Sequence, residues 1–253
     1  MESRVNILGV MISAINMAEA VEVIKQWIWN RDSRYVCVTS AHGIIECQQD
    51  SRLKSIFNQS GLCTPDGMSI VWILRLLGNH QVERVYGPDL LEAVCQESQY
   101  CGWTHFLYGG APGVAELLSN RLRYLFPELK IVGMYTPPFR ELTQEEDQEV
   151  LQRILAVKPN IVWVGLSTPK QERWMAGHIS KLPETVVIGV GAAFDFISRT
   201  KRQAPRWIQR SGTEWLFRLI TEPHRLWRRY FQYPRFVLLV IMQLLGIKRY
   251  DSD

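Results

Sequence analysis

Short apolar runs alternate with longer helix-like segments along most of this 253-residue chain, and this alternation constrains its fold most strongly. Tyr35–Thr39 and Ile161–Gly165 are almost continuously apolar and rich in β-branched residues, which predicts strands buried on both faces. Segments of roughly 10–15 residues with helical periodicity separate such runs. We therefore expect an α/β protein with a Rossmann-like, mainly parallel sheet flanked by helices, formed by a domain over residues 1–198.

Capping patterns indicate where two of the helices begin. Asn16 with Glu19 and Thr143 with Glu146 both have capping-box spacing. The other predicted strands are His105–Tyr108, Lys130–Tyr135 and Thr185–Val190. The predicted helices are Met17–Asn30, Ile44–Gln49, Leu53–Gln59, Met68–Leu77, Pro88–Gln99, Pro112–Leu125, a helix from Thr143 to Val157, and Pro169–Ser180.

The pattern changes in the last part of the chain. From Trp207 onward the sequence is aromatic and rich in arginine, with no strand signal, and Pro223 and Pro234 divide it into short helices. We expect residues 199–253 to form a basic, aromatic helical appendage. This segment has 12 Lys/Arg against 4 Asp/Glu, whereas residues 1–198 have 17 against 21. A basic segment on an acidic body indicates an anionic partner, either a membrane surface or a nucleic acid.

A helix that begins near Glu222 would be amphipathic. Its basic face could contact an anionic leaflet or bind a phosphate through two-pronged arginine contacts. The simpler alternative is a helix packed on the body of the protein with its arginines in water. The basic face would contain Arg225, Arg228 and Arg229, and the other face Leu226, Trp227, Tyr230 and Phe231.

Composition excludes several classes of protein. The 47% hydrophobic and 21% charged content is typical of a folded chain, not a disordered one. No secretory signal is convincing, and the longest apolar run, Phe236–Ile247, is too short to span a membrane. Five cysteines without a Cys-x-x-Cys pair predict reduced, mostly buried thiols of a cytosolic protein, and the five histidines have no metal-ligand spacing.

An aspartate in a tight turn is the first candidate for chemistry. Asp66 lies in Pro65-Asp66-Gly67, between an apolar strand and an apolar helix. Ligands of open α/β folds bind at such strand ends. The alternative is plain turn chemistry, because aspartate caps helices and glycine accepts a positive φ.

Glycines follow several of the predicted strands, at Gly109, Gly110, Gly165 and Gly191. Glycine lets backbone amides approach a phosphate, although tight βα turns also need it for steric reasons. None of these stretches matches a dinucleotide fingerprint or a P-loop. Together they favour a nucleotide or sugar-nucleotide site.

The stretch Pro169–Trp174 begins a helix directly after a strand. Gln171 is a candidate for hydrogen bonding to a sugar or phosphate, with Lys170 and Glu172 as local support. The alternative is a solvated helix start with proline in its first turn.

Six motifs occur together in one order: TPDGM (64–68), RVYGPDL (84–90), FLYGG (106–110), VGLSTPKQERWM (164–175), GVGAAFDF (189–196) and EWLFRLITEPHRLWRRY (214–230). As a set they resemble the WecG/TagA/CpsF family of bacterial glycosyltransferases, over roughly residues 5–235. The resemblance implies an inverting enzyme that transfers a hexosamine-type sugar from a UDP-sugar donor to an undecaprenyl-diphosphate-linked sugar. It implies synthesis of teichoic acid, capsule or another cell-surface polysaccharide. The expected location is cytoplasmic, attached peripherally to the inner face of the bacterial membrane.

The resemblance also implies roles for individual residues. Asp66 matches the catalytic aspartate and Thr39 an active-site threonine, while Arg84 and Gln171 match residues that shape the pocket. Relatives often have an asparagine shortly after that threonine, whereas this chain has Ser40-Ala41-His42, which leaves the donor contacts at this loop open. Substrate binding is further assigned to Lys170, Gly109, Gly110, Gly165, Gly191 and Asp195, and binding of the acceptor diphosphate or membrane to Arg218, Arg225, Arg228 and Arg229.

We expect no metal and no cofactor. The one Asp-x-Asp string in the sequence is Asp251-Ser252-Asp253, at the extreme terminus. The expected partners are the UDP-sugar, the lipid-linked acceptor and an anionic membrane, and an apolar appendage is also compatible with a homo-oligomer.

Three other classes compete with this interpretation. A nucleotide-dependent oxidoreductase would share the fold, but the dinucleotide fingerprint is missing. A nucleic-acid-binding module would use the basic segment, yet it would leave the glycine-tipped strands unexplained. A non-catalytic, membrane-recruited binding protein would not need Asp66.

Overall fold

The computed structural model describes residues 3–251, and the chain divides into two compact units, each described by itself. Unit 1 is built from residues 1–17, 38–86 and 202–253, and unit 2 from residues 18–37 and 87–201. The C-terminal residues from Arg202 onward therefore cluster with two earlier segments of the chain. The prediction of a functionally separate appendage over residues 199–253 stays a prediction.

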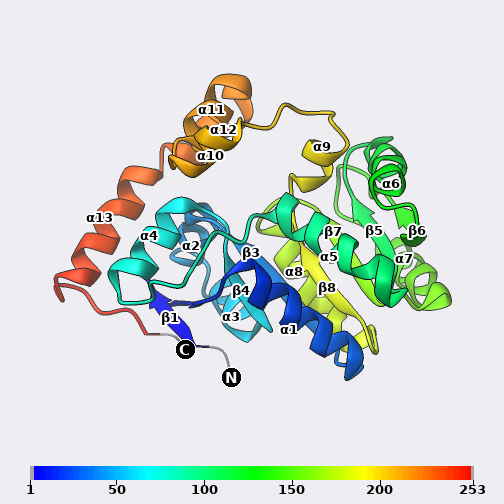
Figure 1. Ribbon diagram of the computed structural model, residues 1–253. Helices are drawn as coiled ribbons and strands as arrows, with labels where there is room; N and C mark the ends of the chain where they lie inside the picture. The colour runs from blue at the N-terminus through cyan, green and yellow to red at the C-terminus, as the bar shows by residue number, and fades with distance from the viewer. Residues whose placement is uncertain (1–2, 252–253) are drawn as a thin grey trace. The chain divides into compact units, whose positions relative to one another are not determined.

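A six-stranded sheet confirms the predicted α/β class (Figure 1). The pairs β3–β8, β8–β7, β7–β5 and β5–β6 are all parallel, and glycines Gly109 and Gly165 lie opposite one another in the register of β5 and β7. The strands, in spatial order, are β4 (Leu62–Pro65), β3 (Arg34–Thr39), β8 (Val186–Gly189), β7 (Ile161–Gly165), β5 (Thr104–Gly109) and β6 (Lys130–Tyr135).

Unit 2 contains six of the described α-helices. The predicted capping box of α7 is present, because Thr143 Oγ1 accepts from the Glu146 amide and the Glu146 side chain accepts from the Thr143 amide. The largest buried side chains of unit 2 include Trp163, Tyr108 and Phe194. The helices are α1 (Met17–Trp29), α5 (Gly87–Cys101), α6 (Val114–Leu125), α7 (Gln144–Val157), α8 (Lys170–His178) and α9 (Ala193–Ile197).

Unit 1 begins with an antiparallel hairpin, β1 (Arg4–Ile7) and β2 (Val10–Ser13), for which no strand was predicted. Leu8 and Gly9, at φ 53° and 82°, form its two-residue turn, the backbone geometry that matches the twist of the strands. Its helices are α2 (Ala41–Cys47), α3 (Ser51–Gln59), α4 (Met68–Leu76), α10 (Arg206–Arg210), α11 (Glu214–Thr221), α12 (Pro223–Tyr230) and α13 (Tyr233–Leu244).

Hydrogen bonds fix the last helix, α13, to the N-terminal hairpin. Gln243 Oε1 accepts from the Leu8 amide at 2.8 Å, and Gln243 Nε2 donates to the Asn6 carbonyl at 2.9 Å. The Asn6 side chain in turn donates to the Tyr250 carbonyl at 2.8 Å. Of the Asp251–Asp253 string, the Asp251 carbonyl accepts from Lys54 Nζ at 3.2 Å, whereas the other two residues lie outside the described part.

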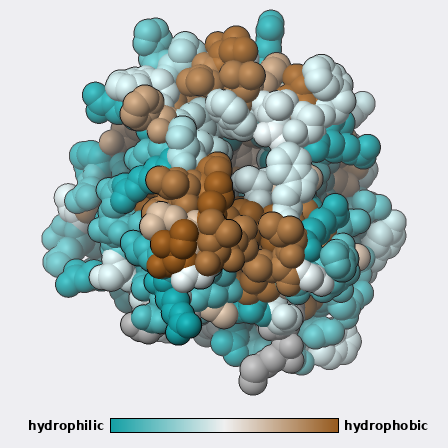
Figure 2. All heavy atoms as spheres, turned by 90° about the vertical axis from the view of Figure 1, so that its left-hand side faces the viewer, coloured by the Kyte–Doolittle hydropathy of each residue, from teal (hydrophilic) through white to brown (hydrophobic). Residues whose placement is uncertain are grey.

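A broad apolar area covers the face of unit 1 formed by α4 and α13 (Figure 2). The two helices lie side by side, since Ile73 and Leu77 line one small cavity together with Val240 and Leu244. Within residues 3–251, none of the helices is long and apolar enough to cross a membrane. The exposed side chains that we call the apolar patch are Trp72, Leu76, Leu77, Val237, Leu238, Ile241, Leu244 and Leu245.

Candidate functional site

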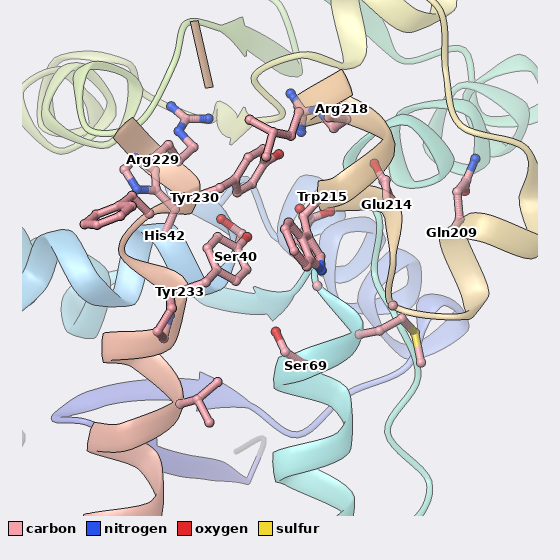
Figure 3. Close-up of a pocket in the computed structure, with 18 of the residues that line it drawn as sticks. Ser40, His42, Ser69, Gln209, Glu214, Trp215, Arg218, Arg229, Tyr230 and Tyr233 are labelled. Atoms are coloured by element: carbon pink, nitrogen blue, oxygen red, sulfur yellow. The ribbon is translucent and has the colours of Figure 1, made fainter. Parts of the chain in front are cut away.

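One cavity of unit 1 has a volume of about 690 Å³, which is in the range of pockets for small ligands (Figure 3). Its walls come from the loop after β4, the first turns of α4 and the C-terminal helices α11, α12 and α13. In Figure 3, Arg218 and Arg229 lie on one side of the cavity, and Ser69 of α4 lies on the opposite side. Residues from three distant parts of the sequence therefore share one pocket.

Asp66 lies in this cavity, directly after β4. Its amide donates to the Thr39 carbonyl at 2.9 Å, and its own carbonyl accepts from Arg84 Nε. These contacts hold the backbone on both sides, while the side chain keeps 24% of its surface exposed. The turn therefore presents a carboxylate that a ligand in the cavity can reach.

Arg84 bridges two carboxylates. Its Nη2 lies 2.7 Å from Glu214 Oε2 and 4.0 Å from Asp66 Oδ1, and its guanidinium carbon lies 3.9 Å from the centroid of the Tyr86 ring. Burial by itself lowers the pKa of Arg84, but the nearby Asp66 and Glu214 outweigh it and raise that pKa. Arg84 is thus a fixed positive charge beside Asp66.

Arg218 and Arg229 add two more positive charges to the lining. Burial lowers the pKa of Arg229, and the positive charge of the neighbouring Arg218 lowers it further. Burial also opposes the charge of Arg218, but Tyr230 and Glu214 outweigh it and raise the pKa of Arg218. Three arginines therefore face two carboxylates in the cavity. The excess of positive charge suits an anionic ligand such as a diphosphate.

The other two arginines of the predicted acceptor set do not line the cavity. Arg225 is exposed and pairs with Glu222 at 2.6 Å, and Arg228 is exposed with its guanidinium carbon 5.4 Å from the Trp227 ring centroid. The two-face pattern predicted for this helix is therefore only partly right. Its buried stripe is Leu226 with Tyr230, so Arg229 turns toward the cavity, while Trp227 and Phe231 are more than half exposed.

Aromatic side chains form much of the remaining wall. The Tyr230 and Tyr233 ring centroids are 5.2 Å apart, and that of Trp215 lies about 6 Å from both (Figure 3). Trp72 and Val237, which belong to the apolar patch, also line the cavity. The charged interior is thus continuous with the apolar surface of α4 and α13.

Thr39 and His42 lie near Asp66 in different ways. Thr39 is buried, its Oγ1 is 3.0 Å from Cys63 Sγ, and it does not line the cavity. Its observed contribution to the site is the carbonyl that accepts from Asp66. His42 does line the cavity, and burial together with Arg229 lowers its pKa to about 3, so it is neutral at physiological pH.

The glycines predicted to approach a phosphate belong to unit 2, and two of them have clear steric reasons. Gly109 has a φ of 125°, and an added Cβ would lie 2.7 Å from the backbone carbonyl of Gly165. An added Cβ at Gly165 would lie 2.6 Å from the Phe194 ring. Gly110 and Gly191 also have positive φ values, at 80° and 52°.

The remaining predicted substrate residues also belong to unit 2. Gln171 is buried and its Nε2 donates to Glu172 Oε1 at 3.0 Å, while its buried Oε1 accepts no hydrogen bond from any described residue. Lys170 is exposed. Asp195 pairs with Lys201 at 2.7 Å, and both side chains stay partly exposed.

The described residues contain neither a cluster of metal ligands nor a disulfide. Across residues 3–251, His, Cys, Asp and Glu side chains form no group of three that could hold a metal ion. All five cysteines are free thiols, and Cys101 is the exposed one.

The structure adds residues to the site that the sequence did not single out. Glu214 is the main one, because it pairs with Arg84, and Tyr86 supports the same arginine. Glu214 lies in the motif EWLFRLITEPHRLWRRY and Tyr86 in RVYGPDL, so the sequence marked both segments. Neither motif indicates that the two segments meet.

Comparisons with known proteins identify the family and relatives of this chain. The model of the Glycosyl transferase WecG/TagA/CpsF family matches residues 5–250. A protein of Bacillus spizizenii strain W23 is 29% identical over 78% of this chain and 74% of its own. A Bacillus subtilis strain 168 protein is 29% identical over 74% and 71%, and a Staphylococcus aureus strain NCTC 8325 protein is 25% identical over 89% and 88%. Each relative is named N-acetylglucosaminyldiphosphoundecaprenol N-acetyl-beta-D-mannosaminyltransferase.

Proposed function

This chain belongs to the WecG/TagA/CpsF family of glycosyltransferases, and from that premise we propose that it transfers a hexosamine-type sugar from a UDP-sugar to an undecaprenyl-diphosphate-linked sugar with inversion. The family predicted from the motifs is thereby confirmed, and the enzyme is a glycosyltransferase. The names of the relatives describe N-acetyl-β-D-mannosamine transfer to N-acetylglucosaminyl-diphosphoundecaprenol, which supports the proposed acceptor class. The proposed pathway is cell-surface polysaccharide synthesis, such as teichoic acid, capsule or exopolysaccharide.

The accessible Asp66 carboxylate in a positively charged cavity is the observation that carries the proposal. In the proposed step, Asp66 accepts the proton of an acceptor hydroxyl while that oxygen attacks the anomeric carbon of the donor. The bond between that carbon and the UDP oxygen breaks, and UDP leaves with the electron pair. A positioned base contributes about 10²–10⁴ in rate, and holding both substrates in line contributes to the rest.

The acceptor diphosphate is assigned to the arginine side of the cavity. Arg218 and Arg229 are buried enough to form strong charge-assisted bonds, and the N-terminal turn of α4 at Gly67, Met68 and Ser69 also favours an anion. The aromatic wall suits the apolar lipid next to that diphosphate. Because Trp72 and Val237 join the cavity to the apolar patch, the lipid could continue onto that surface.

The donor is assigned to unit 2. Gln171 offers a buried acceptor atom without a hydrogen bond from the described residues, and Gly191 lies beside it, since a Cβ there would be 3.5 Å from Gln171 Oε1. Carboxyl ends of parallel strands are where nucleotides bind in open α/β sheets. The proposed donor residues remain Gln171, Lys170, Gly109, Gly110, Gly165, Gly191 and Asp195.

We also propose peripheral attachment to the anionic inner face of the bacterial membrane. The apolar patch and the exposed Arg225 and Arg228 belong to the same unit, a combination typical of helices that bind anionic bilayers. Sedimentation with phosphatidylglycerol vesicles tests this point. Leu238→Glu in the patch should weaken binding, whereas Leu117→Glu, which is similarly exposed on α6, should not. Equal binding of both variants and wild type contradicts the membrane proposal.

Product analysis tests the transfer reaction itself. The purified protein is incubated with a panel of UDP-sugars and a short-chain prenyl-diphosphate-N-acetylglucosamine, and the products are identified by mass spectrometry. We expect one added N-acetylhexosamine and release of UDP, in EDTA as well as in magnesium. No product with any UDP-sugar would refute the proposed function, and turnover that EDTA abolishes and magnesium restores would refute its metal independence.

A further inference from the structure

Glu214 is a buried carboxylate whose two oxygens have different partners. It lies in the first turn of α11 with only 8% of its surface exposed. Its Oε1 accepts from the Tyr86 hydroxyl at 3.1 Å, and its Oε2 lies 2.7 Å from Arg84 Nη2. A buried carboxylate is costly unless it is paired, so these contacts account for its place in the fold.

Arg84 is in turn held from three directions. Glu214 pairs with its Nη2, the Tyr86 ring lies under its guanidinium, and its Nε donates to the carbonyl of Asp66. Tyr86 is itself contacted by Gln203, whose Nε2 lies 3.4 Å from the tyrosine hydroxyl. The network connects helix α11 to the loop that contains Arg84 and, through Arg84, to the turn that contains Asp66.

We propose that Glu214 is a positioning residue that fixes Arg84 and keeps its charge shared between two carboxylates, so that Asp66 stays an effective base. This inference rests on the proposed transferase function. Without the Glu214 charge, Asp66 is the nearest carboxylate to Arg84, at 4.0 Å, and a closer pair between them would make Asp66 a weaker base. The other titratable groups that line the cavity are His42, Arg218, Arg229, Tyr230 and Tyr233.

Kinetics of Glu214→Gln test the inference, because glutamine keeps the shape and removes the charge. We expect kcat to fall about 10-fold, which corresponds to a coupling of ordinary size between contacting residues, with the acceptor KM changed less than kcat. The acidic limb of the kcat/KM profile should move to lower pH, because loss of a neighbouring negative charge favours ionised Asp66. Glu214→Asp should restore part of the rate.

A double-mutant cycle separates positioning from general damage. In an Arg84→Ala background, Glu214→Gln should cause little additional loss, because the residue that it positions is already absent. The inference would be overturned if the rate losses of Arg84→Ala and Glu214→Gln multiplied in the double variant. A wild-type rate and pH profile for Glu214→Gln alone would also overturn it.

NMR of ¹⁵N-labelled arginine gives a readout that does not depend on activity. In the wild type, restricted rotation should give Arg84 resolved guanidinium NH signals, and Glu214→Gln should broaden them while the folded spectrum persists. Unchanged Arg84 signals in that variant would overturn the inference. A wild-type protein that transfers no sugar would instead refute the proposed function, and the NMR result would still decide whether Glu214 fixes Arg84.

Discussion

Replacing Asp66 by asparagine gives the sharpest test of the proposed chemistry. Asparagine has nearly the same shape, and the hydrogen bonds that hold the backbone of residue 66, from its amide to the Thr39 carbonyl and from Arg84 Nε to its carbonyl, do not involve the carboxylate. The fold should therefore survive. The variant removes the proton acceptor and changes the charge of the cavity lining from three arginines against two carboxylates to three against one.

These two effects have different consequences for the kinetic constants. Loss of a general base should lower kcat by about 10²–10⁴, which corresponds to about 2.7–5.4 kcal/mol in the activation free energy. The cavity becomes more positive, so the anionic acceptor should bind at least as well as before. We therefore expect a large fall in kcat with an unchanged or lower acceptor KM.

Initial rates of UDP release, measured with the lipid-linked acceptor, provide the assay. Asp50→Asn is a matched control, because Asp50 caps α3 through the Leu53 amide, lies outside the cavity, and asparagine caps equally well. The control should keep wild-type kinetics and thermal stability. If Asp66→Asn retained the wild-type kcat, or if its loss appeared only in KM, the assignment of Asp66 as the base would be wrong.

Three further predictions address the arginines, the glycines and pH. Arg218→Ala should raise the acceptor KM about 10–100-fold, because charge-assisted bonds to the diphosphate are lost. Arg225 is exposed and pairs with Glu222, so Arg225→Ala should change the acceptor KM little in the same assay. Equal effects of the two substitutions would contradict the assignment. Gly109→Ala should lower the free energy of unfolding by about 1–3 kcal/mol, whereas Gly177→Ala, in α8 with open space around it, should raise it by about 0.5–1 kcal/mol, as urea titration would measure. His42 has its pKa lowered from 6.5 to about 3 by burial, so the unfolded chain binds a proton below about pH 6.5 that the native state does not. The free energy of unfolding should therefore fall as the pH drops from about 6.5 toward about 3, by up to about 1.4 kcal/mol per pH unit. His42→Gln should reduce that slope in urea titrations at stepped pH.

Local sequence patterns predicted most secondary structure of the α/β region correctly. Lys130–Tyr135 and Ile161–Gly165 are strands with the predicted bounds, because a short, mostly apolar run between helix-like segments is a signal that the local sequence carries by itself. The hairpin β1–β2 was missed. Its turn residues, Leu8 and Gly9, include a leucine at positive φ, which turn preferences do not indicate.

The Pro65-Asp66-Gly67 turn shows how far local chemistry extends. Its residue types alone fit both a helix start and a catalytic turn, and the family resemblance was needed to favour catalysis. The cavity around Asp66 is built mainly from helices α11, α12 and α13, and periodicity along those helices does not specify which neighbour each face will meet.

The amino-acid sequence by itself determined the class of fold, the family and the presence of an acidic turn, because each depends on residue types at short or fixed spacing. Only the tertiary structure decided which arginines face the cavity: Arg218 and Arg229 line it, whereas Arg225 and Arg228 are exposed. It also decided that Glu214 would meet Arg84. Such contacts depend on how α11 and α12 bury their apolar stripes, and a shift of one residue in that packing turns a different charge inward.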